Sequence, residues 1–423
     1  MTNIVRTRLL TFIAGLIIVP VGTVLAVMFA KGYRPDLQKG QITVSGILSA
    51  HTYPENAQII INGQPASSVT NANLNLPPGQ YTVEFKKEGY SAWKKDLLIE
   101  KEIVTTATAV LFPTVAALKP INYQPAYLVT LSPDGTKVVY LSQTNQIYSL
   151  DLSESPLGIL NRDSRLIGAL PPGLSRSAFQ STWSPDSRFI LIADPTTFKN
   201  ASPSAYFIDP NNQRISSAAS SVVYLLQSWK DRRITLQAQM FNTLPPALKP
   251  VLATASADLV WSPRENKLLY TATASAALPD KIKPPLPGSN TQLQNRQLQP
   301  GRVYVYDLEE DRNFQIDEIV PVTPTPKKTK AKTSQTVSNQ VSLPNNGWSW
   351  FPTSSHLYRV RNNQVTITEY DGQNPTIVYS GPLYENTAIP YPSGKQMLLL
   401  TRFETTPAAS SSAEPSLYAL TLR

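Results

Sequence analysis

The sequence predicts an all-β protein behind one N-terminal transmembrane helix. An uncharged apolar run extends from Leu9 to Ala30, and short segments that alternate apolar with polar residues dominate after residue 40. Proline is frequent, 37 of 423 residues, and helix-period patterns are scarce beyond the first run. Alternation with a period of two, punctuated by Pro, Gly, Asn and Asp, is typical of strands and turns. We therefore expect two β domains of unequal size, over residues 41–112 and 121–423.

The apolar run is long enough to span a bilayer. A helix over residues 9–30 would be roughly 33 Å long, about the thickness of the hydrocarbon layer. Pro20 lies near its middle, where a membrane helix tolerates a kink. Arg6 and Arg8 favour a cytoplasmic tail over residues 1–8 and an extracytoplasmic location for the bulk of the chain. A cleaved signal peptide is the alternative, although the run exceeds the usual length of such segments.

Charge and cysteine content exclude several classes of protein. The net charge is +9, but nearly all of it comes from the first 40 residues and from four lysines between residues 327 and 332. The folded parts are close to neutral, so we expect no nucleic-acid partner. Because the chain has no cysteine, it has no disulfide framework, thiol nucleophile or thiolate zinc site.

The first folded unit follows a linker over residues 31–40 and contains clear turn signals. Asn62-Gly63 predicts a tight hairpin, and Pro78-Gly79 predicts a type II turn. The unit contains four characteristic sequence blocks, and Trp93 follows the last of them. The blocks are Pro54–Ala57, Ile59–Gly63, Leu76–Tyr81 and Lys87–Tyr90. This pattern resembles the PEGA domain. The resemblance implies a small β-sandwich of bacterial and archaeal surface proteins that contacts protein or glycan at the envelope, without catalysis.

One position departs from the PEGA pattern, and a few aromatic residues invite a binding role. Asn56 stands where glycine is usual, so this position is not expected to need a conformation restricted to glycine. Tyr81 lies on the apolar face of a predicted strand and is expected in the core. Tyr90 and Trp93 are the candidate ligand contacts, because flat aromatic faces pair with sugar rings; packing against the sheet is the alternative.

A short box recurs along the second folded unit, which follows a linker over residues 113–120. An aromatic or apolar residue, then a proline-containing polar turn, leads into an apolar run, which predicts a tight turn before a buried strand. The boxes are Leu131–Gly135, Trp183–Arg188, Trp261–Arg264, Trp350–Thr353 and Tyr391–Lys395. Trp229–Leu236 is interpreted as a degraded sixth box.

Six boxes predict a six-bladed β-propeller over residues 121–423, because four-stranded blades repeat at about 40–50 residues. The boxes resemble those of TolB-like propellers. A seven-bladed ring or two smaller sandwiches are the alternatives. Two inserts, near residues 279–300 and 319–345, are rich in proline or poor in large apolar side chains, and we expect them to be disordered.

The sequence offers no recognisable catalytic or metal-binding apparatus. His51 and His356 are the only histidines, and each is expected at the surface or at a strand edge. Asp134, Asp186 and Asp231 repeat in the boxes, where hydrogen bonding within a turn explains them better than a pair of catalytic carboxylates. We expect no catalytic residue, cofactor or metal.

The predicted function is therefore binding at the cell envelope. The protein would be a non-enzymatic, single-pass membrane protein whose PEGA domain acts as a spacer and whose propeller contacts envelope proteins or cell-wall glycan. The alternative is a propeller hydrolase that acts on envelope glycan or peptide. The lack of a nucleophile motif and the scarcity of histidine favour the first function.

Overall fold

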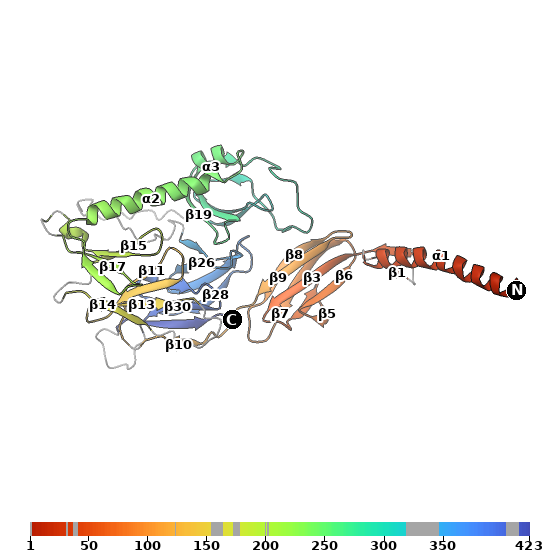
Figure 1. Ribbon diagram of the computed structural model, residues 1–423, viewed down its shortest axis with the longest axis horizontal. Helices are drawn as coiled ribbons and strands as arrows, with labels where there is room; N and C mark the ends of the chain where they lie inside the picture. The colour runs from red at the N-terminus through yellow and green to blue at the C-terminus, as the bar shows by residue number, and fades with distance from the viewer. Residues whose placement is uncertain are drawn as a thin grey trace. The chain divides into compact units, whose positions relative to one another are not determined.

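The computed structural model describes residues 2–30, 33–36, 41–122, 124–153, 164–171, 178–198, 200, 203–318, 347–402 and 414–423. The chain forms two compact units, each discontinuous in sequence. The first comprises Met1–Leu111 with Pro284–Leu293, and the second comprises Phe112–Lys283 with Gln294–Arg423. Figure 1 traces the elements of both units.

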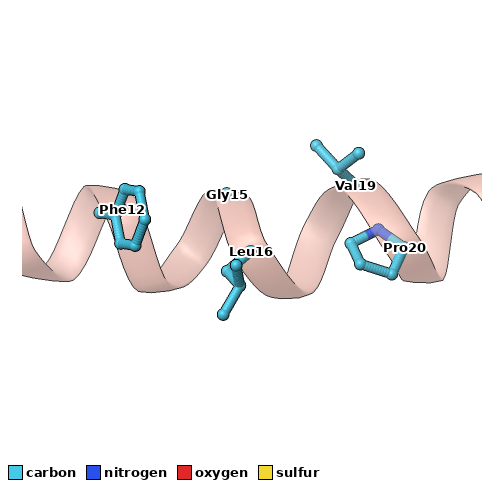
Figure 2. Close-up of a pocket in the computed structure, with 5 residues that line it drawn as sticks. All are labelled: Phe12, Gly15, Leu16, Val19 and Pro20. Atoms are coloured by element: carbon cyan, nitrogen blue, oxygen red, sulfur yellow. The ribbon is translucent and has the colours of Figure 1, made fainter.

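Helix α1, Thr2–Ala30, includes the whole predicted span from Leu9 to Ala30, with Pro20 inside it. The described side chains on this helix are those of residues 12–28, and most of its large apolar ones are exposed. Figure 2 shows five neighbouring residues that line a shallow apolar recess on one stretch of α1, Phe12, Gly15, Leu16, Val19 and Pro20. Within the described residues, no helix has both the length and the apolar character of a membrane span. The predicted span therefore stays a prediction.

A short hairpin follows where the sequence predicted a linker over residues 31–40. Strands β1, Tyr33–Asp36, and β2, Gln41–Val44, pair antiparallel, with Tyr33 opposite Val44. The assignment of residues 31–40 to a linker between the helix and the first folded domain stays a prediction.

The rest of the first unit is a sandwich of two sheets. One sheet has the order β6-β3-β9, with β3 and β9 parallel, and the other has the order β5-β4-β7-β8. The strands are β3 Gly46–Tyr53, β4 Gln58–Ile61, β5 Gln64–Val69, β6 Ala72–Leu76, β7 Gly79–Lys86, β8 Trp93–Ile99 and β9 Val104–Val110. Alternation places Val83 and Phe85 of β7 fully inside. One apolar cluster between the two sheets forms the core.

The turn predictions for this unit have mixed outcomes. Asn62 and Gly63 have φ of 50° and 80°, which confirms the tight hairpin between β4 and β5. The prediction of a type II turn at Pro78-Gly79 is wrong, because Gly79 lacks the positive φ that this turn requires. Gly79 is instead the first residue of β7 and pairs with Ile99. Asn56 has φ of 61°, so the position does take the left-handed conformation, which asparagine tolerates better than most residues.

In its described part, the second unit contains five four-stranded antiparallel sheets. Their orders are β11-β12-β13-β14, β15-β16-β17-β18, β19-β20-β23-β24, β25-β26-β27-β28 and β10-β31-β30-β29. The last sheet pairs Leu118–Pro120, near the start of the unit, with the final strand of the chain, so both ends of the unit share a sheet. Such sharing of one blade closes a propeller, because it joins the first and last segments by hydrogen bonds.

The strands of these sheets are short and alternate with turns. They are β10 Leu118–Pro120, β11 Tyr127–Leu131, β12 Lys137–Leu141, β13 Gln146–Asp151, β14 Arg165–Ala169, β15 Gln180–Trp183, β16 Ile190–Ala193, β17 Ala205–Asp209, β18 Arg214–Ser217, β19 Ser256–Trp261, β20 Lys267–Ala272, β23 Arg302–Asp307, β24 Arg312–Glu318, β25 Trp348–Trp350, β26 His356–Arg361, β27 Gln364–Glu369, β28 Thr376–Ser380, β29 Ala388–Pro390, β30 Gln396–Thr401 and β31 Ser416–Thr421. Single 3-10 turns occur at η2 Pro195–Thr197 and η3 Tyr384–Asn386.

Each of the five clear boxes joins the first strand of a sheet to its second strand. The residue two positions after the box proline has a positive φ in every case, which reverses the chain within a few residues. These residues are Gly135 (72°), Ser187 (61°), Glu265 (58°), Ser354 (61°) and Gly394 (66°). The prediction of a tight turn before a buried strand is confirmed for these boxes.

The prediction of a degraded sixth box over residues 229–236 is wrong. Residues 229–236 lie inside helix α2, Val222–Asn242, which is followed by helix α3, Lys249–Ala255. No Pro or Gly occurs between residues 211 and 244, so neither of the strongest helix breakers interrupts this stretch. Helices therefore stand between the second and third sheets along the chain.

The apolar clusters on the sheets before and after these helices show which sheet faces the helices cover. Ile190 and Ile192 of β16 pack toward the preceding sheet, while Leu191 and Ala193 pack in a separate cluster with Trp229 of α2. A further cluster joins Leu252 of α3 to Tyr270, Tyr304 and other residues of the next sheet. In Figure 1, α2 runs from the β15–β18 sheet toward α3 beside β19. The helices thus cover one face of the sheet that precedes them in the chain and one face of the sheet that follows them.

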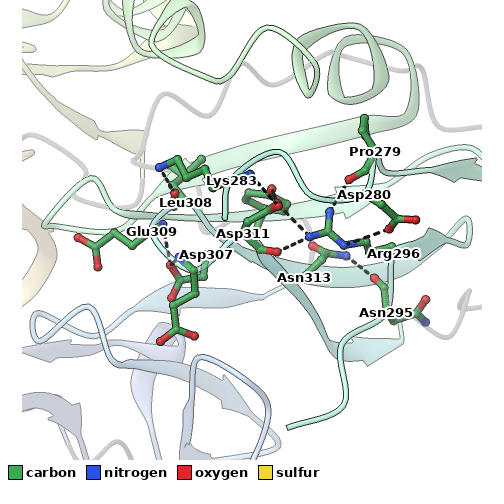
Figure 3. A network of polar contacts seen from close by, with 12 residues as sticks. Pro279, Asp280, Lys283, Asn295, Arg296, Asp307, Leu308, Glu309, Asp311 and Asn313 are labelled. Atoms are coloured by element: carbon green, nitrogen blue, oxygen red, sulfur yellow. Dashed lines mark hydrogen bonds and ion pairs between the residues drawn. The ribbon is translucent and has the colours of Figure 1, made fainter. Parts of the chain in front are cut away.

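The insert predicted near residues 279–300 has a defined structure. Strands β21, Ala276–Ala277, and β22, Gln297–Leu298, pair at its base. The guanidinium of Arg296 donates to the carbonyls of Pro279 and Asp311 and forms an ion pair of 2.9 Å with the Asp311 carboxylate, as Figure 3 shows. The prediction of disorder is wrong here, because buried polar contacts replace the missing apolar ones. The second predicted insert, residues 319–345, lies outside the described residues.

Candidate interaction surface

The repeated acids of the boxes serve the turns. The hydroxyl of Ser184 donates to the Asp186 carboxylate at 2.6 Å and accepts the backbone N–H of Phe189 at 2.9 Å. Ser132 makes the same bond to Asp134, also at 2.6 Å. Each pair closes its own turn, which accounts for both residue types without a catalytic role.

The ionisation of these carboxylates follows from the same bonds. The Ser184 hydroxyl lowers the pKa of Asp186, because it stabilises the charged form and outweighs the effect of slight burial. Burial alone would raise the pKa of Asp134, but hydrogen bonds from Ser132 and Thr136 outweigh it and lower the pKa. Asp231 lies instead on α2, where it accepts from Gln227 at 2.8 Å, so the three acids do not occupy equivalent turns.

The box turns also bind one another. The backbone N–H of Asp134 donates to the Ser187 hydroxyl of the next box at 3.0 Å. The equivalent bond runs from Arg264 to Ser354, again at 3.0 Å. Within the described residues, no such bond links the second box to Glu265 of the third. The equivalent positions of the other three boxes are Gly135, Glu265 and Gly394, which have no hydroxyl to accept such a bond.

The two histidines lie in different units and have different surroundings. His356 is 7% exposed and makes edge contacts with Phe112 and Phe351, so the expectation of a surface position is wrong for it. The half-buried His51 lies in β3, with its ring 3.0 Å from the Ser49 hydroxyl. In the part of the chain that the structure describes, no cluster of three or more His, Cys, Asp or Glu residues could hold a metal.

The two aromatic candidates in the first unit differ in accessibility. Trp93 is 3% exposed and its ring stacks on Phe85 with centroids 4.7 Å apart. A sugar cannot reach a ring face covered in this way, so the packing alternative holds for Trp93. Tyr90 is half-buried at the edge of the same core and stays a predicted ligand contact.

The segment from α2 to α3 presents a surface with large exposed apolar side chains. Val222 and Trp229 are the buried residues of α2, whereas Val223 is 62%, Tyr224 75% and Ile234 53% exposed. A 21-residue helix that buries so little presents a large solvent-facing surface. The sequence signal that could have revealed it is the run without Pro or Gly over residues 211–244.

Positive charge accompanies these exposed apolar side chains. Lys230, Arg232 and Arg233 lie on α2 with Asp231 as the acidic residue among them. Arg233 is half-buried, and burial lowers its pKa. Exposed apolar side chains beside arginines are typical of protein-binding surfaces, where aromatic residues and arginine are enriched.

Comparison with known proteins bears on the first unit. Residues 45–114 match the family model of the PEGA domain. This confirms the PEGA prediction. The match starts beside β3 and ends just after β9, so the PEGA domain coincides with the two-sheet sandwich.

Among solved structures, the chain is similar to TolB from Acinetobacter baumannii, with 12% identity and a TM-score of 0.22, over 89% of this chain and 64% of that one. It is also similar to a putative TolB from Agrobacterium tumefaciens, with 11% identity and a TM-score of 0.20, over 69% of this chain and 78% of that one. The chain thus spans less than two thirds of the first of these structures. No curated protein matches the sequence.

Proposed function

We propose that the protein is a non-enzymatic, membrane-anchored binding protein of the cell envelope, whose second unit binds a partner protein through α2. The observation that carries the proposal is the exposed apolar and basic surface of this helix, with Tyr224 at 75% exposure. The PEGA match supports the envelope location. In this proposal the PEGA domain is the spacer between the membrane and the second unit.

Anchoring by α1 is part of the same proposal. Ten large apolar side chains between Phe12 and Val27 are at least 42% exposed, and that stretch carries no charged residue. Exposure of so many apolar groups to water would be unfavourable, by roughly 25 cal/mol per Å². A lipid environment would remove that cost. Release of the second unit from intact cells by external protease, after the wall is made permeable, would test the topology; protection equal to that of a cytoplasmic protein would contradict it.

Site-specific crosslinking tests the binding role. A photo-crosslinking residue at position 224 of the full-length protein in its membrane is expected to capture a discrete partner protein. The matched control places the same residue at Leu166, which is 44% exposed on β14. Equal capture at both positions, or capture of wall polymer alone, would contradict a protein partner at α2.

Charge reversal sharpens the test. Lys230→Glu with Arg232→Glu is expected to reduce capture at position 224 several-fold if the partner surface is acidic. The control, Lys119→Glu with Arg165→Glu, makes the same charge change on β10 and β14 and is expected to leave capture unchanged. Turnover of a glycan or peptide library by the purified protein would contradict its non-enzymatic nature.

A further inference from the structure

The first unit contains a segment from a distant part of the sequence. Between β21 and β22 the chain makes a long excursion, and its middle part, Pro284–Leu293, belongs to the unit of the PEGA sandwich. The base of the excursion is fixed by Arg296 and by Lys283, whose backbone N–H donates to Asp311 at 3.1 Å (Figure 3). The base of the excursion therefore has specific contacts within the second unit, and Pro284–Leu293 belongs to the first unit.

The segment binds an edge strand of the sandwich. Strand β8 is the last strand of its sheet, so one side of it has no neighbouring strand in that sheet. The carbonyl of Asp96 in β8 accepts two hydrogen bonds from the segment, from the Thr291 hydroxyl at 3.1 Å and the Gln292 amide at 2.7 Å. The segment thus satisfies a backbone group that an edge strand would otherwise expose to water.

The segment also approaches the neighbouring edge, β9, through its backbone. Gly288 has φ of 68°, and a Cβ placed on it would lie 2.6 Å from the carbonyl oxygen of Val104. Both facts require glycine, the first because of the left-handed conformation and the second because of the lack of space. Thr105 of β9 donates to the Leu98 carbonyl of β8 at 3.2 Å, so the two edges lie side by side beneath the segment.

The attachment is polar and shallow. Residues 284–287 are exposed, and Leu293 is 94% exposed. No side chain of the segment belongs to the apolar core of the sandwich. Contacts of this kind bind weakly between separate molecules, and they persist here because the covalent connection keeps the segment near the edge.

We propose that the paired β8–β9 edge of the PEGA sandwich is a docking surface for an extended, uncharged peptide of a partner protein, and that Pro284–Leu293 occupies it in the free protein. The partner peptide would present a glycine at the Val104 carbonyl and side-chain donors three and four residues later to the Asp96 carbonyl. Addition of extended peptides to sheet edges is a common mode of recognition. This binding site is separate from the α2 surface of the proposed function.

A competition experiment tests the proposal. In a full-length variant, residues 286–292 are replaced by a Gly-Ser sequence of equal length. A fluorescent peptide with the sequence of residues 282–295 is then added to the variant and to the wild-type protein. The variant is expected to bind the peptide at least ~10-fold more tightly, because the wild-type segment competes at an effective concentration in the millimolar range. Equal affinity for both proteins, or no binding to either, would overturn the proposal.

Two controls separate docking from general damage. The peptide carrying Gly288→Ala is expected to bind at least ~10-fold more weakly than the unmodified peptide, and equal binding would also overturn the proposal. In the full-length protein, Gly288→Ala is compared with Gly63→Ala, which has φ of 80° but open space around its Cβ. Only the Gly288→Ala protein is expected to bind the free peptide more tightly than wild type, because its own segment no longer occupies the β8–β9 edge. If Gly63→Ala opens it equally, strain and not the lost contact explains the result.

Discussion

The two units of this protein build their interiors differently. The PEGA sandwich has one apolar cluster, which receives side chains from both of its sheets. The second unit has a series of separate clusters, each between two neighbouring sheets or between a sheet and a helix. A single core makes the sandwich dependent on each of its large side chains. In the second unit, a substitution in one cluster is expected to affect only the sheets that form this cluster. A helix can therefore take the place of a sheet in one cluster without disrupting the others.

The largest expected effect comes from the centre of the sandwich. Trp93→Ala removes the ring that stacks on Phe85 and is expected to destabilise the first unit by about 3–5 kcal/mol. Hydrogen exchange of the full-length protein should show lost protection in β4, β7 and β8 with β20 and β26 unchanged. Val69→Ala, at a side chain 49% exposed, is the control and should change little. Equal loss of protection in both units would contradict the difference between them.

The second prediction concerns helix α2. Gln237→Pro, at an exposed position of α2, is expected to cost about 3 kcal/mol locally, because proline removes a helical hydrogen bond and clashes with the preceding turn. Helical circular dichroism should decrease, while protection in the β25–β28 sheet is retained. Gln237→Ala should preserve the helix or stabilise it slightly. If both variants retain the same helical signal, the segment is not the helix described.

A smaller effect is expected from the bonds between box turns. Ser354→Gly keeps the positive φ but removes the acceptor of the Arg264 N–H, at an expected cost of about 0.5–1.5 kcal/mol. Glu265→Gly relieves the same conformation without removing a partner of this bond, so it should be neutral or stabilising. Urea unfolding of the second unit, followed by hydrogen exchange, measures both. Similar destabilisation by the two variants would show that the bond between turns contributes nothing.

The smallest effect is a dependence on pH. The pKa of Asp186 in the folded protein lies below its ordinary value of 3.8, so the carboxylate stabilises the fold above that value. This contribution is lost as the pH falls through the folded pKa. Asp186→Asn should therefore weaken the β15–β16 turn at neutral pH, and the difference from wild type should shrink between about pH 5 and pH 2. A difference that stays constant over this range would contradict the assigned ionisation.

Local signals in the sequence predicted much of the fold. Asn62-Gly63 specified a hairpin through backbone preference alone, and five boxes marked the five sheets because each needs a chain reversal before its buried strand. Pro78-Gly79 failed because pairing of Gly79 with Ile99 extended the strand through the expected turn. Trp229 was assigned to a box from a few letters, although the surrounding composition favours a helix.

The candidate surfaces were harder to predict. Trp93 was a candidate binding residue because the sequence does not show whether an aromatic ring is buried. Its burial depends on stacking against Phe85, which is a tertiary contact. The exposed apolar residues of α2 could not be recognised while the segment was interpreted as strands. The insert near residues 279–300 was expected to be disordered because its order depends on Arg296 and on distant partners that composition does not reveal.

By itself, the sequence determined the β character of the chain, the PEGA domain and the number of clear box turns, because these features depend on residues that are close together in the sequence. Tertiary structure decided which aromatic rings are buried, that residues 229–236 lie in a helix, and that Pro284–Leu293 lies on the PEGA sandwich. The physical reason is the range of the interactions. A turn conformation is set within a few residues, whereas burial and edge docking depend on segments almost two hundred residues apart, such as Asp96 and Gln292.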